Sequence, residues 1–404
     1  MKLMRMRPEN CADDRSLRVA LPQILIRHMK FAGYAWLPLA ALAAACGGPT
    51  TNGSFGSGDD QSDASGSGSG DGGTPTGSRD GGGGAGDGGG SDGGSQNDSG
   101  GSGGPCTTDT GPISGTVGAT GGSISRLVFA VAGDTRPANE DDPSGYPTTI
   151  ITKIFQDIEA LTPRPALVLG TGDYQFSSTG SNATGPQQVG IYMQTRQSYS
   201  GPFFPAMGNH ECGVSGGFTT SDNNNCGPGN QGGVTPNYTG FMSQMLGPIS
   251  QTNPYYSINV NATDNSWTAK FVVTAANAWD TAQQTWLETT MSQNTTYTFV
   301  VRHEASDATP PLPPGVAGVD AVLAQHPYTL LIVGHAHTYG HYSDAPQTVV
   351  FGNGGAPLSS KDYGYGLFSQ RCDGAIVADA IDYMSGATDS EFHFVITPQG
   401  TITQ

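Results

Sequence analysis

Five short apolar runs, each ending in side chains that can bind metal ions, constrain this sequence more than any other feature. They span residues 126–134, 166–173, 201–211, 297–304 and 328–337. Short apolar runs that stop at a glycine or a polar side chain are typical of buried strands that lead into loops. Helical spacing of apolar residues over 150–161 and 281–293 lies between some of the runs. This alternation favours parallel βαβ units.

The remaining apolar runs predict further strands. Residues 255–260 and 267–276 predict a strand pair. A closing series predicts a mixed or antiparallel partner sheet, at residues 347–355, 365–372, 375–385 and 391–398. In the helix expected over 281–293, Trp286 and Leu287 should lie on the buried side. We therefore predict an α/β fold in which two facing mixed β-sheets are flanked by helices.

A glycine-rich stretch is excluded from any folded core. Residues 47–105 contain 25 glycines, 11 serines and 8 aspartates in 59 positions. Such a segment cannot bury enough apolar surface to offset the entropy lost on ordering. Glycine does not recur at every third position, which excludes a collagen helix. We predict a disordered tether over 47–112 and one folded domain over 113–404.

The N-terminus carries a predicted export signal. Residues 31–45 form an apolar run, shorter than the ~20 residues that span a bilayer but suited to a signal peptide. The small residues before Cys46 resemble a bacterial lipobox. We predict an over-extended start over 1–28, a lipoprotein signal peptide over 29–46 and lipidation of Cys46. The expected location is a bacterial outer membrane or cell surface; the alternative is a cleaved signal and a periplasmic or secreted protein.

The cysteines agree with export. Four follow the leader, and an even number in an oxidising compartment suggests two disulfides with three possible pairings: Cys106, Cys212, Cys226 and Cys372. Cys212 and Cys226 bracket a loop rich in glycine and asparagine, so we predict that these two pair. This leaves Cys106 to pair with Cys372.

The net charge restricts the expected partners. The whole chain carries −17, and residues 106–404 contain 9 Lys/Arg against 23 Asp/Glu. An acidic domain repels polyanions, so nucleic acid and acidic lipid surfaces are not expected partners. Contact with a membrane is expected only through the N-terminal lipid anchor.

The ends of the five runs supply a set of metal-ligand side chains. In α/β folds, ligands gather at the carboxyl ends of strands. Imidazoles suit Zn, Fe or Mn, and two cations ~3.5–4 Å apart can clamp a displacement at phosphorus. We therefore expect two divalent or trivalent ions, with Asp173 bridging them and a metal-bound hydroxide as nucleophile. The candidate ligands are Asp134, Asp173, Asn209, His303, His335 and His337.

The motifs GDTR, GDYQF, GNHE, VVRH and GHAHTY occur in this order over about residues 126–355. The chain resembles the calcineurin-like metallophosphoesterase superfamily, particularly its purple acid phosphatase-like branch. The resemblance implies a metallophosphoesterase-type β-sandwich. It places one metal on Asp134, Asp173 and His337, and the other on Asp173, Asn209, His303 and His335. It also implies that His210 stabilises the transition state or protonates the leaving oxygen.

Two positions depart from the family pattern. Many members begin with Asp-x-His, and the histidine position here is Arg136. The purple branch has a tyrosine three residues after the second aspartate, where this chain has Phe176. We expect a weaker first metal site and no tyrosinate colour, and Tyr174 is a doubtful substitute because it follows Asp173 directly. Arg136 is expected either to bind a phosphoryl oxygen in bidentate fashion or to form a salt bridge on its loop.

The leading hypothesis is a metal-dependent phosphoesterase, a phosphatase-type hydrolase (EC 3.1), acting on a small phosphorylated substrate. One alternative is a catalytically weak metal-binding domain that binds a phosphorylated surface ligand. Another is a structural surface protein whose main feature is the tether. Ser-His-Asp hydrolysis is not supported, because no GxSxG pattern lies at a predicted strand-to-helix turn, as a nucleophile elbow requires. The loop 212–236, next to GNHE, is expected to shape the substrate pocket.

Overall fold

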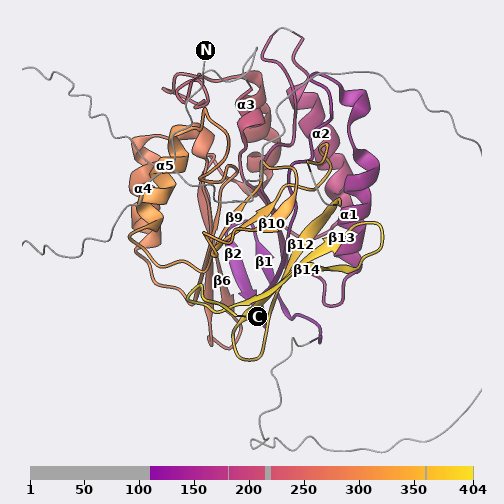
Figure 1. Ribbon diagram of the computed structural model, residues 1–404, viewed down its shortest axis with the longest axis vertical. Helices are drawn as coiled ribbons and strands as arrows, with labels where there is room; N and C mark the ends of the chain where they lie inside the picture. Colours follow the sequence, from indigo (N-terminus) through magenta and orange to yellow (C-terminus); the bar gives the residue numbers. More distant parts are fainter. Residues whose placement is uncertain (1–109, 181, 214–219, 360–361, 404) are drawn as a thin grey trace, which may run out of the picture. The chain divides into compact units, whose positions relative to one another are not determined.

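The computed structural model describes residues 110–180, 182–213, 220–359 and 362–403 (Figure 1). The predicted export signal, Cys46, Cys106 and most of the predicted tether lie outside the described residues. The α-helices are α1 (Thr148–Ala160), α2 (Gly185–Thr195), α3 (Pro236–Phe241), α4 (Thr281–Met291) and α5 (Pro314–Leu323). The strands are β1 (Gly115–Gly118), β2 (Gly121–Ile124), β3 (Val128–Val131), β4 (Leu167–Gly170), β5 (Phe203–Pro205), β6 (Tyr256–Ala262), β7 (Thr268–Val273), β8 (Tyr297–Val301), β9 (Leu330–Val333), β10 (Tyr339–His341), β11 (Thr348–Phe351), β12 (Gly364–Gln370), β13 (Ile376–Asp382), β14 (Thr388–Ile396) and β15 (Ile402–Thr403).

The described strands form two mixed sheets. One has the order β1-β2-β6-β7-β8-β9-β11-β10, and the other β15-β14-β13-β12-β3-β4-β5. Strands β3, β4 and β5 are parallel, as are β7, β8, β9 and β11. Strands β12 to β15 are antiparallel and join β3 through β12, so they extend its sheet and do not form a separate one. The first run of the predicted closing series, residues 347–355, contains β11, which pairs in parallel with β9 of the other sheet, so its assignment to the partner sheet is wrong. The predicted α/β fold of two mixed sheets flanked by helices is confirmed.

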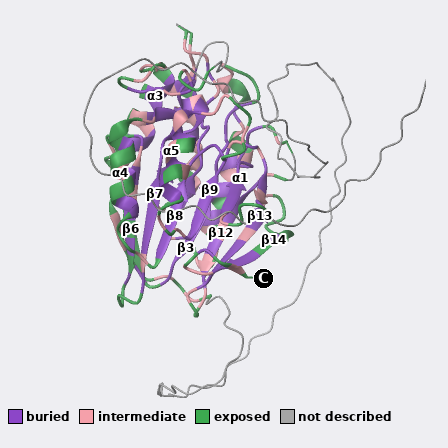
Figure 2. Ribbon diagram, turned by 60° about the vertical axis from the view of Figure 1, so that its left-hand side comes forward, coloured by how far each residue is buried: buried purple, intermediate pink, exposed green. Residues whose placement is uncertain are grey.

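Aromatic rings fill the space between the two sheets. The ring centroid of Phe129 in β3 lies 5.1 Å from that of Phe271 in β7 and 4.9 Å from that of Phe299 in β8. Successive strand residues point to opposite faces, so Val272 and Val300 pack instead in the cluster that contains α4 and α5 residues. Helices α4 and α5 therefore cover the outer face of the sheet that contains β7 and β8. The strands between these helices and the second sheet are buried (Figure 2).

Helices α1 and α2 lie on the opposite side of the sheets from α4 and α5 (Figure 1). The α1 face formed by Ile151, Ile154, Phe155 and Ile158 is buried, and the Phe155 ring lies 6.1 Å from Phe203 of β5. Both sheets are therefore enclosed between helices, and their strand ends open into loops. Within the described residues, no helix is both long and apolar enough to cross a membrane.

Most of the elements expected from hydrophobic spacing are present. Helix α4 buries Leu287 as predicted, but Trp286 is only half-buried and packs on Tyr255, with ring centroids 4.9 Å apart. Helices α2 and α5 were not predicted. Each contains two glycines (GPQQVGIYMQT and PGVAGVDAVL), which weaken the intrinsic helix propensity. Their formation depends on packing.

Candidate metal centre

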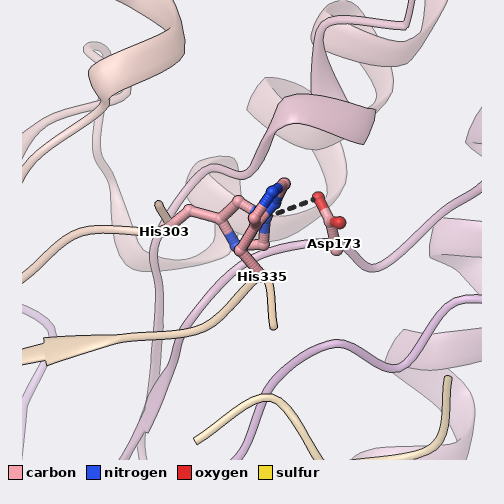
Figure 3. A group of neighbouring side chains, drawn as sticks. All are labelled: Asp173, His303 and His335. Atoms are coloured by element: carbon pink, nitrogen blue, oxygen red, sulfur yellow. Dashed lines mark hydrogen bonds and ion pairs between the residues drawn. The ribbon is translucent and has the colours of Figure 1, made fainter. Parts of the chain in front are cut away.

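Each candidate ligand follows the end of a strand. Asp134, Asp173 and Asn209 follow β3, β4 and β5 of one sheet, and the histidines follow β8 and β9 of the other. The structure brings ligand atoms of Asp173, His303 and His335 within 4.8 Å of one another. Those of Asp134, Asp173 and His337 lie equally close, so the two groups share Asp173. Figure 3 shows the first group, with both imidazoles beside the Asp173 carboxylate.

The first group contains converging acceptor atoms. His303 Nδ1 lies 2.8 Å from the carbonyl oxygen of Thr171, which can only accept, so the imidazole donates there. In the neutral ring, Nε2 then carries a lone pair. This atom faces Asn209 Oδ1 at 3.0 Å and Asp173 Oδ1 at 3.3 Å. His335 Nδ1 lies 3.2 Å from both His303 Nε2 and Asn209 Oδ1. A nitrogen and oxygen donor set that converges in this way fits a cation.

The second group is oriented in a similar manner. His337 Nδ1 donates to the Pro357 carbonyl at 2.8 Å, and its Nε2 lies 3.7 Å from Asp134 Oδ1. In histidines that bind metals, a hydrogen bond from the other ring nitrogen fixes the orientation of the ring. The backbone N–H of His335 donates to the Asp134 carboxylate at 3.0 and 3.1 Å. One strand-end turn therefore orients ligand atoms of both groups.

Four of the candidate ligands have left-handed backbone conformations. The φ angles are 55° at Asp134, 56° at Asp173, 70° at His335 and 27° at His337. Positive φ is uncommon outside glycine, and such residues cost about 1 to 3 kcal/mol each and cluster at functional sites. The packing of the two sheets must therefore hold these turns in place.

Burial and opposite charges shift the pKa values in the site. Burial, together with the charge of Asp173, raises the pKa of Asp134 to about 8 despite the opposing charge of His303. Burial also acts to raise the pKa of Asp173, but the charge of His303 and its hydrogen bond to the carboxylate outweigh burial and hold this pKa well below its usual range. Burial lowers the pKa of His335 to about 3. The buried carboxylates of Asp134 and Asp173 have ligand atoms within 4.8 Å of each other. Because like charges this close repel, a cation between them is favoured.

The two predicted catalytic side chains lie beside these groups. The His210 backbone N–H donates to Asp173 Oδ1 at 3.1 Å, and His210 Nε2 lies 3.8 Å from Asp173 Oδ2. The Arg136 guanidinium carbon lies 4.4 Å from the centroid of the Phe176 ring, which in turn lies 4.8 Å from the ring of His210. Tyr174 is fully buried among aromatic residues such as Tyr192, at 4.9 Å between ring centroids. It therefore points into the core.

Glu211 has a role that its place in the sequence does not reveal. Its carboxylate is fully buried and accepts hydrogen bonds from the backbone N–H groups of Asp173, Tyr174 and Gly208 at 2.9, 2.9 and 2.7 Å. It thereby joins the turns that carry Asp173 and Asn209. Burial and the charge of Asp173 raise its pKa to about 7. The only signal in the sequence was its position at the end of GNHE.

The disulfide predicted between Cys212 and Cys226 is present, with Cα atoms 5.4 Å apart. The second predicted pair involves Cys106, which lies outside the described residues, so the Cys106–Cys372 disulfide stays a prediction.

Comparison with known proteins gives a family and several similar folds. The family model described as Calcineurin-like phosphoesterase matches residues 127–339. No curated protein matches the chain. Among solved structures, GAP50, the anchor in the inner membrane complex of Plasmodium, is 15% identical, with 68% of this chain and 89% of that chain covered and a TM-score of 0.46. Purple acid phosphatase PPD1 from yellow lupin seeds is 16% identical, with 70% and 55% covered and a TM-score of 0.47. A dimetal phosphatase from Danio rerio is 12% identical, with 67% and 98% covered and a TM-score of 0.44. Because the family model spans more than half of the sequence, and every candidate ligand lies within it, the chain belongs to the calcineurin-like phosphoesterase family.

Proposed function

We propose that this protein is a metal-dependent phosphoesterase that hydrolyses small phosphate esters at a two-metal site. The observation that carries the proposal is the pair of ligand groups that share Asp173, each with its ligand atoms within 4.8 Å of one another. Membership of the phosphoesterase family supports the same reaction class. Two adjacent cation sites suit displacement at phosphorus, because cations can stabilise both the attacking and the leaving oxygen.

In this proposal, Asp134, Asp173 and His337 hold one cation, and Asp173, Asn209, His303 and His335 hold the other. Zn, Fe or Mn ions suit this mixture of imidazole, carboxylate and amide ligands. When bound, the ions would neutralise phosphoryl charge and lower the pKa of water. Asn209 contributes a neutral oxygen, so the site keeps enough positive charge to attract a phosphate group.

The side chains of the protein orient the substrate. Arg136 is proposed to bind a phosphoryl oxygen with its planar guanidinium group, which stacks on Phe176. His210 is proposed to stabilise the transition state or to pass a proton to the leaving oxygen. Burial lowers the pKa of His210 to about 3 despite the carboxylate of Asp173. This favours a neutral imidazole that donates one hydrogen bond to the transition state over an imidazolium that passes a proton to the leaving oxygen.

The test is hydrolysis of p-nitrophenyl phosphate and bis(p-nitrophenyl) phosphate after chelation and addition of Mn, Zn or Fe. Asp173→Asn should lower the activity by about 10²- to 10³-fold, because the residue belongs to both groups and each ion contributes several kcal/mol. The matched control is Asp379→Asn, which removes a carboxylate that pairs with His393 at 2.7 Å. Equal activity of Asp173→Asn and the wild type would contradict the proposal.

A second candidate is a weakly active metal-binding domain that binds a phosphorylated surface ligand. The observation that favours it is the stacking of Arg136 on Phe176, because the family patterns place metal ligands at these two positions. Such a domain would bind one ion per chain, bind phosphate and hydrolyse neither ester. Two bound ions together with hydrolysis would exclude it.

We also propose that the domain over 113–404 is exported and anchored through a lipid on Cys46, with residues 47–112 as its tether. The apolar run before Cys46 and the glycine-rich composition after it support this proposal. Mass spectrometry of the N-terminal peptide tests it, since an unmodified cysteine or a different cleavage site would contradict it.

A further inference from the structure

A chain of buried contacts connects the disulfide to one of the two ligand groups. We propose that the Cys212–Cys226 disulfide, Asn277 and Glu304 position Asn209 and His303, and so set the metal affinity of the group formed by Asp173, Asn209, His303 and His335. This inference rests on the proposed function. It assigns positioning roles to residues that hold neither metal nor substrate.

At one end, the disulfide is tied to the turn of Asn209. Cys212 directly follows the 3₁₀ turn Asn209–Glu211. The backbone N–H groups of Cys212 and Gly213 donate to the Asn209 carbonyl oxygen at 3.0 and 3.2 Å. A shift of Cys212 would therefore move the backbone that carries the Asn209 side chain.

At the other end, the disulfide meets Asn277. The backbone N–H of Cys226 donates to the Asn277 carbonyl oxygen at 2.7 Å, and Cys212 Sγ lies 3.0 Å from the same oxygen. Asn277 Nδ2 then donates to Glu304 Oε1 at 2.5 Å and to Asn224 Oδ1 at 2.9 Å. Glu304 directly follows His303, so the contacts reach the second ligand of the same group.

The residues that make these contacts are shielded from water. Cys212, Cys226 and Asn277 are 0% exposed, and Glu304 is 1% exposed. Glu304 Oε2 and Asn277 Oδ1 are buried without a hydrogen-bond partner among the described residues. Glu304 therefore depends on the Asn277 amide, because a buried carboxylate that loses its donor is strongly destabilised. Loss of Asn277 would force Glu304, and with it His303, to move.

These contacts should act more strongly on the group formed by Asp173, Asn209, His303 and His335 than on the other group, which shares only Asp173 with it. They end at Asn209 and His303, whose Oδ1 and Nε2 atoms lie 3.0 Å apart. Asp134 and His337 follow other strands, β3 and β9. A disulfide that only stabilises the fold would lower the unfolding temperature without changing the ratio of the two metal affinities. The ratio is therefore the diagnostic quantity.

The test is a titration of the chelated full-length chain with Co²⁺, which gives two stepwise dissociation constants. His335→Ala and His337→Ala identify which constant belongs to which group. Asn277→Ala should raise the dissociation constant of the His335 group by about 10-fold or more, as expected for residues that support metal ligands. The constant of the His337 group should change by less than about 2-fold.

Asn225→Ala is the matched control. Two hydrogen bonds tie Asn225, in the same loop, to Trp279. Asn225 Nδ2 donates to the Trp279 carbonyl oxygen at 3.1 Å, and the Trp279 backbone N–H donates to Asn225 Oδ1 at 2.7 Å. These bonds lead away from His303. Asn225→Ala should leave both constants within about 2-fold. The double variant Cys212→Ala/Cys226→Ala should repeat the selective loss seen with Asn277→Ala.

A second pair of variants keeps the test decisive if Asn277→Ala does not fold. Glu304→Gln retains an oxygen that can accept from Asn277, whereas Glu304→Ala does not, so only the alanine variant should weaken the His335 group. Equal changes at both groups, or a lower unfolding temperature with an unchanged affinity ratio, would overturn the inference. A wild-type chain that binds no Co²⁺ would instead overturn the proposed function.

Discussion

At the residue scale, Arg136 is the side chain that should separate substrate binding from chemistry. Arg136→Lys keeps the positive charge but loses the planar group that stacks on Phe176 and can bind two oxygens. Loss of one charge-assisted hydrogen bond costs about 1.5 to 3 kcal/mol. We expect KM for p-nitrophenyl phosphate to rise about 10-fold or more while kcat changes by less than about 3-fold. Steady-state kinetics measure both.

The control for Arg136 is Arg371→Lys, which alters an arginine paired with Asp373 at 2.7 Å away from the candidate ligands. It should leave both kinetic constants unchanged. If Arg136→Lys instead lowers kcat with an unchanged KM, the guanidinium group acts in the chemical step and not in binding.

Asp141 should make stability depend on pH. Burial acts to raise the pKa of its carboxyl group, but hydrogen bonds from Ser177, Ser178 and Thr184 outweigh burial and lower this pKa to about 2. Because the folded pKa lies below the usual 3.8, the stabilisation is full above about pH 4 and is lost as pH falls toward 2. Asp141→Asn preserves the tolerance for the left-handed φ of 54° at this position.

The measurement for Asp141 is urea unfolding of both proteins at pH 5, 4, 3 and 2. The wild type should be more stable than Asp141→Asn at pH 5, and the difference in unfolding free energy should shrink by about 1 to 2 kcal/mol toward pH 2. A difference that is constant with pH would show that the carboxylate charge plays no part.

At the element scale, the turn after β5 is built around a close approach. A Cβ atom on Gly208 would lie 2.3 Å from Asp173 Oδ1 and 2.7 Å from the Asp173 backbone nitrogen. Gly208→Ala should therefore displace Asp173 and weaken metal binding at both groups by about 10-fold or more, while overpacking costs about 1 to 3 kcal/mol of stability. Metal titration and thermal unfolding measure the two effects.

Gly180→Ala is the control for the turn, because a Cβ at Gly180 would meet no atom within 4 Å. It should change neither metal affinity nor stability. Metal binding by Gly208→Ala equal to that of the wild type would mean that the turn can shift without moving the shared carboxylate.

The elements also show where sequence periodicity fails. Strands β3, β4, β8 and β9 were predictable because they are buried on both faces and read as continuous apolar runs. Strands β1 and β2 were missed, since GTVG and GGSI contain too few apolar residues to give a period. In the structure, Val117 of β1 lies opposite Gly122 of β2, and β2 pairs with β6. These pairings exist only in the assembled sheet.

At the scale of the whole molecule, the two sheets and the proposed ions should stabilise one another. The candidate ligands come from strand ends of both sheets, so a bound ion would connect them. An ion present at 100 times its dissociation constant stabilises the folded state by about 2.7 kcal/mol. For a domain of this size, chelation should lower the unfolding temperature by about 5 °C or more.

Differential scanning fluorimetry of the wild type and of Asp173→Asn, each with and without chelator, tests this coupling. The chelator should shift the wild type and leave Asp173→Asn nearly unchanged. Equal shifts in both proteins would indicate that the stabilising ion binds elsewhere.

The sequence by itself determined the family and the candidate ligands. Strand ends are local features, and each motif carries its Asp, Asn or His at the point where an apolar run stops. Only the tertiary structure decided how these side chains are oriented. The buried Glu211 carboxylate and the Thr171 carbonyl act across 37 and 132 positions of sequence. The stacking of Arg136 on Phe176 likewise joins two separate loops. Such contacts leave no periodic signal, because they arise only when two sheets bring distant turns to one edge.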